Sequence, residues 1–204
     1  MWPLVVSTVG VAVVHALAPD HWVPFVAIGR AQDWSVRKLV LVTVLAGIGH
    51  VGSSIVLGLI GLALGFLLQG VQAFESARGE VAGLILIGFG LAYAVWGLKQ
   101  ARHEHRPIEK SQIVTVWTLI AIFVLGPCEP LIPLMLLAAQ HGWAAVWIVS
   151  VLFSVATLAM MVGQALLAYL GVRLLATERL ERWTHALAGA LIALTGLLVM
   201  ALGI

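Results

Sequence analysis

Long apolar runs dominate this chain and limit the folds that it can adopt. A helix needs about 20 apolar residues, with a range of roughly 17–25, to cross a hydrocarbon core of about 30 Å. Six runs reach this length, at residues 3–28, 38–68, 81–98, 113–138, 143–172 and 184–203. Hydrophobic residues make up 62% of the chain and charged residues 10%, which excludes an ordinary soluble domain. We therefore expect an all-α polytopic membrane protein with six transmembrane helices.

The basic residues predict how the chain is oriented in the membrane. Ten of the eleven Lys and Arg residues fall in three expected loops, and only Arg78 falls in a loop on the other side. Cytoplasmic loops carry the excess of Lys and Arg, so we expect a multi-pass protein of the cell (inner) membrane with both termini outside. The same residues account for the net charge of +2, which therefore gives no indication of nucleic-acid binding.

Two segments broken by proline resemble one another. They read His15-Ala-Leu-Ala-Pro-Asp-His-Trp-Val-Pro24 and Val124-Leu-Gly-Pro-Cys-Glu-Pro-Leu-Ile-Pro133, and a shift of 109 residues places Asp20 on Glu129. We interpret the chain as two homologous halves, residues 1–98 and 113–204, joined by a cytoplasmic loop at 99–112. Three spans in each half would make them inverted repeats, an architecture of many alternating-access transporters.

Glycine supports the same division of the chain. At a shift of 106 residues, glycines of the third span fall on glycines of the sixth, and they recur every seven residues: Gly83, Gly90 and Gly97 match Gly189, Gly196 and Gly203. This period puts each set on one face of its helix. Small residues let helices approach closely in lipid, so we expect these faces to be packing faces.

The prolines predict breaks in the first and fourth helices. Each one removes a backbone donor and disfavours helical geometry in the residue before it; they are Pro19, Pro24, Pro127, Pro130 and Pro133. Irregular backbone is tolerated at membrane depth only where protein buries it or where it lines a polar cavity. We therefore expect both breaks to line a cavity in which a cation could bind.

Asp20 and Glu129 are the only carboxylates inside the expected spans, and no Lys or Arg lies there to neutralise them. A charge at the bilayer centre costs about 2.5–3.5 kcal/mol on insertion scales, so such residues mark function by default. The first two spans also hold His15, His21 and His50. Imidazole and carboxylate together suit Ni, Co, Zn or Fe better than Mg or Ca.

The second half keeps the acid but lacks the imidazoles. At the shift of 109, the positions of His15, His21 and His50 hold Val124, Pro130 and Ala159. We therefore expect an asymmetric metal site that the first half mostly provides and that Glu129 closes. Cys128, the sole cysteine, is either a thiolate ligand or a small buried residue. Gln164 and the Met160–Met161 pair are further candidates, although methionine at helical spacing usually packs in a core.

Other interpretations stay open at this point. A sulfite or organosulfonate exporter should present positive charge within the membrane. A thiol-electron carrier of cytochrome c biogenesis should have a cysteine in each half, yet Pro19 stands at the position that corresponds to Cys128. A membrane subunit without transport activity would leave the paired acids unexplained. His103, Glu104 and His105 belong either to a solvated loop or to a metal-collecting one.

The residues that carry this argument resemble a known signature. The stretch His15-Ala-Leu-Ala-Pro-Asp20-His21, followed by Gly49-His50, is similar to the motifs of nickel/cobalt transporters. The chain most resembles their six-span, urease-accessory-type relatives of the lysine-exporter-like superfamily, in which a Gly-Pro-Cys-Glu-like segment opens the second half. The resemblance implies membrane transport of Ni²⁺ or Co²⁺, with matching positions at His15, Asp20, His21 and His50.

A mechanism follows as a hypothesis. We expect a secondary transporter, not an enzyme, whose halves rock around a site near the midplane. The metal ion would be the substrate, with no permanently bound cofactor, and the lipid bilayer would be the other partner. Histidine and aspartate must be deprotonated to bind metal, so coupling to protons is expected. The sequence leaves the direction of transport and homo-oligomerisation open.

Overall fold

The structure is a computed structural model that describes residues 1–64, 68–102, 109–126, 128–175 and 183–202. All regular secondary structure in these ranges is helical. The elements are α1 (Trp2–Ala16), the 3₁₀ turn η1 (Pro19–His21), α2 (Val23–Ala31), α3 (Val36–Leu64), α4 (Leu68–Arg102), α5 (Glu109–Leu125), α6 (Leu131–Ala139), α7 (Trp143–Leu175) and α9 (Thr184–Leu202).

Four of these helices, α3, α4, α7 and α9, are long and apolar enough to cross a membrane. The bundle also presents many large apolar side chains on its outside, such as Val6 and Leu167, which are 68% and 76% exposed. In water such a surface would drive association. The predicted all-helical class is confirmed, and the long apolar helices indicate a membrane protein.

The third span differs from its prediction. α4 begins at Leu68, well before residue 81, and it includes Glu75, Arg78 and Glu80. The part of α4 that is long and apolar enough to cross a membrane covers Gly70–Ala101. The prediction that Arg78 lies in a loop was therefore wrong, and so was the prediction that the long apolar helices hold no carboxylate besides Asp20 and Glu129 and no basic residue. Glu75 is 1% exposed and forms an ion pair with Arg78, so the two charges compensate each other inside the bundle.

The expected loop at 99–112 is also shorter at both ends. α4 continues to Arg102 and α5 starts at Glu109. His103, Glu104 and His105 lie outside the described residues, and so does Pro127.

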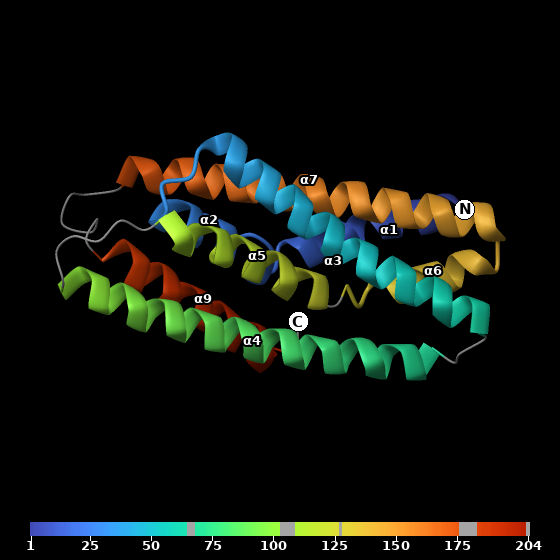
Figure 1. The fold of residues 1–204 in the computed structure, drawn as a ribbon. Coiled ribbons are helices and arrows are strands. Elements are labelled where there is room, and N and C mark those ends of the chain that lie inside the picture. Colours follow the sequence, from blue (N-terminus) through green and yellow to red (C-terminus); the bar gives the residue numbers. More distant parts are fainter. Residues whose placement is uncertain (65–67, 103–108, 127, 176–182, 203–204) are drawn as a thin grey trace.

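Both breaks fall near the middle of the bundle. α1 and α6 lie toward one end of it and α2 and α5 toward the other (Figure 1). α1 ends at Ala16, η1 begins at Pro19, and α2 begins at Val23 with a proline in its first turn. α5 ends at Leu125 and α6 begins at Leu131, just after Pro130. The predicted interruptions of the first and fourth helices are therefore present.

The closest packing joins α4 to α9, along the glycine faces. A Cβ atom added at Gly90 would lie 2.4 Å from the backbone nitrogen of Ala193, and one added at Gly189 would lie 2.2 Å from that of Ala94. These helices thus touch backbone to backbone, which confirms the packing face for the described glycines. Gly203 lies outside the described residues.

Two apolar clusters fill the bundle around the breaks. One includes Phe25, Phe123 and Met161, and the other includes Leu131, Met135 and Phe153. His15 and His50 lie between the clusters, since the His50 ring is 6.1 Å from that of Phe123 and the His15 ring is 6.1 Å from that of Phe153. Met161 is fully buried in the first cluster and so packs as core.

Candidate metal site

Three histidines meet at the first break. Nε2 of His15, in the last turn of α1, lies 3.1 Å from Nε2 of His21 in η1 and 3.5 Å from Nε2 of His50 in α3. On a regular helix, His15 and His21 would point about 120° apart at 3.6 residues per turn. The change from α1 to the 3₁₀ turn at Pro19 removes this divergence. The break thereby brings two side chains of one segment onto one point.

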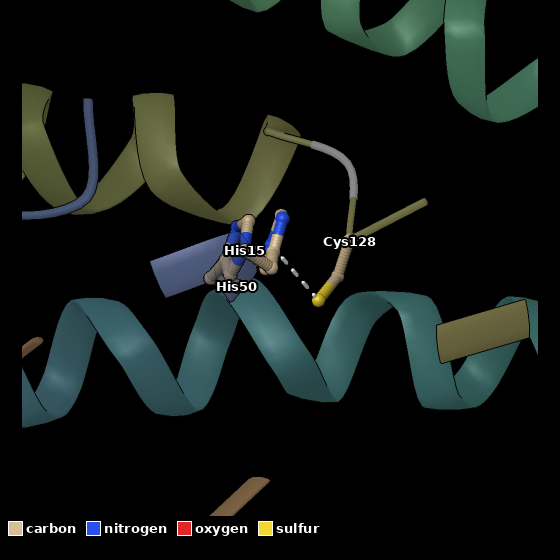
Figure 2. Close-up of side chains that lie close together, drawn as sticks. All are labelled: His15, His50 and Cys128. Atoms are coloured by element: carbon tan, nitrogen blue, oxygen red, sulfur yellow. Dashed lines mark hydrogen bonds between the residues drawn. The ribbon is translucent and has the colours of Figure 1, made fainter. Parts of the chain in front are cut away.

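The thiol of Cys128 reaches the same point from the second break. Its Sγ atom lies 3.4 Å from Nε2 of His15, and the residue is fully buried. One possible ligand atom from each of His15, His50 and Cys128 lies within 4.8 Å of the other two. Figure 2 shows these side chains pointing toward one another from α1, α3 and the segment that follows α5. Cys128 is the only member of the group from the second half.

Asp20 contacts His21 at Nδ1, the ring nitrogen that does not face His15. Its Oδ1 atom lies 3.0 Å from Nδ1 of His21, and the His21 side chain is 3% exposed. A carboxylate can only accept, so Nδ1 of His21 donates this bond and its Nε2 turns a lone pair toward His15. Metal-binding histidines commonly have such a carboxylate partner, which fixes the tautomer and the ring orientation. The structure thus places Asp20 where it orients His21.

Glu129 lies differently from Asp20, its counterpart in the other half. It is exposed on the turn that follows Cys128. Both acids line a cavity of about 1010 Å³, together with His15, His21 and His50. Among the residues that the structure describes, the Glu129 carboxylate has no hydrogen-bond or ion-pair partner. It borders the space in front of the histidines and holds none of them.

Sequence reasoning missed a polar network beside the second break, in which Ser54 and Glu75 are buried and Arg78 is partly buried. Ser54 Oγ accepts a hydrogen bond from the backbone N–H of Cys128 (3.0 Å) and donates one to Oε2 of Glu75 (3.1 Å). The signal that could have found the pair is the spacing of Glu75 and Arg78, since opposite charges three residues apart on a helix face one another. Their charges instead lowered the local hydropathy and moved the predicted start of the span.

The chemistry of this cluster favours a transition-metal cation. Imidazole suits Zn, Cu, Fe and Ni, and a thiolate adds preference for softer ions, whereas Mg²⁺ and Ca²⁺ prefer sets of oxygen ligands. Ring nitrogens that face each other at 3.1–3.5 Å need a proton or a cation between their lone pairs. The separations are small enough for one ion to replace the bonds now present.

Comparisons with protein-family models, with curated proteins and with solved structures gave no match.

Proposed function

We propose that this protein is a secondary membrane transporter of divalent transition-metal cations, with Ni²⁺ and Co²⁺ as the foremost substrates. The observation that carries the proposal is the convergence of His15, His21, His50 and Cys128. They come from four separate segments and meet beside a cavity of about 1010 Å³. Sites formed by interrupted helices near the bilayer midplane are a common feature of transporters.

The topology is part of the proposal. α1 with α2 would form the first span and α5 with α6 the fourth, and these two broken helices run in opposite directions along the bundle (Figure 1). This direction supports two inverted three-helix repeats. With both termini outside the inner membrane, the α4–α5 and α7–α9 connections would face the cytoplasm. Imidazole and thiol ligands must lose protons to bind metal, so metal movement would be coupled to protons.

The geometry gives less support to the other functions. A sulfite exporter would need a cationic group that faces the cavity. Arg78 is now within a span, but it is paired with Glu75 and donates to backbone carbonyls. A thiol-electron carrier would need a second thiol, and the chain has one cysteine.

The test is metal flux in proteoliposomes, followed by element analysis for Ni, Co, Zn, Fe and Mn. We expect selective movement of Ni or Co by the wild type, which Asp20→Asn and His50→Ala reduce or abolish. His141→Ala is the matched control, because His141 is an exposed histidine in the α6–α7 turn. Folding of each variant is checked by gel filtration in detergent. If folded, inserted wild type moves none of the five metals, the proposal is wrong, and sulfite flux becomes the next assay.

A further inference from the structure

The buried ion pair of α4 has no role in the function described so far. The Glu75 side chain is 1% exposed and that of Arg78 12% exposed. A charged pair inside a membrane protein carries a large desolvation cost, and an apolar pair of similar size often serves stability as well or better. What these two residues contact therefore indicates what they do.

Arg78 covers the broken end of α5. Its Nη2 atom donates to the carbonyl oxygens of Val124 (2.9 Å) and Gly126 (3.4 Å) and to Ser53 Oγ (2.9 Å). The last carbonyls of a helix have no partner within the helix, and the hydrocarbon region offers no water to supply one. A guanidinium has five donors and favours a helix C-terminus electrostatically. Arg78 thus satisfies the backbone at the break, where a bound cation had been expected.

Glu75 connects Arg78, through Ser54, to the backbone of Cys128. It holds Arg78 on one side and accepts from Ser54 Oγ on the other, and Ser54 in turn accepts from the backbone N–H of Cys128. Ser54 and Cys128 are both fully buried. The segment on either side of residue 127 is therefore held at Val124 and Gly126 by Arg78 and at Cys128 by Ser54. These contacts hold the Cys128 backbone from which the Sγ atom extends.

We infer that Glu75, Arg78 and Ser54 are positioning residues that hold the Cys128 thiol at the His15–His50 pair and thereby make it a metal ligand. The inference rests on the proposed function, and it assigns this network a part in selecting the cation. With the thiol in place, the set has nitrogen and sulfur donors and favours Co, Ni or Zn. With the segment released, nitrogen donors alone remain, and selection against harder ions weakens.

Co²⁺ serves as the spectroscopic probe, because a thiolate ligand gives a charge-transfer band in the near ultraviolet and a purely structural role would not affect that band. The full-length wild type in detergent micelles is titrated with Co²⁺, and Cys128→Ser identifies the band by removing it. For Ser54→Ala and Arg78→Ala we expect a weaker band relative to the visible d–d bands. Their Co²⁺ affinity should fall roughly 10–100-fold, which is the usual range when a residue that supports a metal ligand is lost. Arg78→Lys, which keeps the charge but loses the planar fork, should restore part of the band.

Lys99→Gln is the control, because Lys99 is an exposed cation on the same helix and should leave the spectrum unchanged. If Arg78→Ala does not fold, Ser54→Ala still tests the inference, since it removes one hydroxyl and no charge. A full-intensity band in Ser54→Ala or in folded Arg78→Ala overturns it. Wild type that binds Co²⁺ without the band also overturns it but leaves the proposed function standing. Wild type that binds neither Co²⁺ nor Ni²⁺ overturns the proposed function itself.

Discussion

The two helix breaks satisfy their backbone hydrogen-bonding groups in different ways. At the first, short-range bonds satisfy the backbone: the N–H groups of Leu17 and Ala18 donate to Val14 and His15, and the Trp22 indole donates to Leu17. At the second, the carbonyls of Val124 and Gly126 accept from Arg78 on another helix. Where the backbone bonds stay within the broken segment, the side chains of that segment can face the cavity. Where they come from another helix, that helix helps to set the position of the segment.

The two breaks therefore contribute different groups to the candidate metal site. The first break provides His15, His21 and the carboxylate that orients His21. The second provides Cys128, whose backbone N–H donates to Ser54. The two similar segments thus contribute different groups, and three experiments test how much this difference matters.

The largest effect is expected for His15→Ala. Nε2 of His15 lies within 3.5 Å of ligand atoms of His21, His50 and Cys128 alike, so its loss removes the atom that joins the two breaks. Loss of partners behind the ligands costs roughly 10–100-fold in metal affinity, and we expect removal of this central ligand to exceed that range. Isothermal titration with Ni²⁺ in detergent measures it. Affinity within a few-fold of wild type would show that the cluster is not the binding site.

An intermediate effect is expected for Asp20→Asn, compared with Glu129→Gln. Asparagine cannot supply the charge that orients His21, so metal affinity should fall roughly 10–100-fold. Glu129 is exposed and orients no histidine, so its variant should change affinity by much less. The same titration compares the two. Equal losses would mean that the two acids act as equivalents, and the asymmetry described above would then be wrong.

The smallest effect is expected for Trp22→Phe. The indole bond to the Leu17 carbonyl is long, at 3.4 Å, and the neighbouring N–H groups keep the first break closed without it. A typical hydrogen bond contributes about 0.5–1.5 kcal/mol, so we expect a loss at or below the lower end. Thermal unfolding in detergent measures it against Arg78→Ala, for which the loss should be clearly larger. A Trp22→Phe variant as unstable as Arg78→Ala would remove the distinction between a locally closed break and one held from outside.

Much of the fold could be predicted from composition and proline. Apolar runs indicate helices because each residue adds to the signal independently, and Pro19 and Pro130 mark interruptions because of their own backbone chemistry. The start of α4 could not be predicted in this way. Glu75 and Arg78 count separately against a span in a hydropathy sum, but in the folded protein they compensate each other.

The site was predictable as a set of residues and less so as a geometry. The sequence shows that His15, His21 and His50 all lie in the first two expected spans, but their convergence depends on the break at Pro19. The placement of Asp20 behind His21 depends on how the chain turns at Pro19, and helical periodicity ceases to apply there. Glu129 shows the same limit. Its position in the repeat suggested a ligand, whereas the orientation of the turn beside it leaves it exposed in the cavity wall.

The backbone contact between α4 and α9 has a mechanical consequence. Rotation or sliding of one helix against the other would bring a side chain against the partner's main chain. We therefore expect α4 and α9 to move together as one rigid unit. Arg78 extends from this unit and donates a hydrogen bond to the Val124 carbonyl at the end of α5. A displacement of the α4–α9 unit relative to α5 would therefore break the hydrogen bonds of Arg78 or move the chain at Val124 and Gly126 with it. The glycines of the α4–α9 contact would in this way influence the position of the Cys128 thiol without touching it.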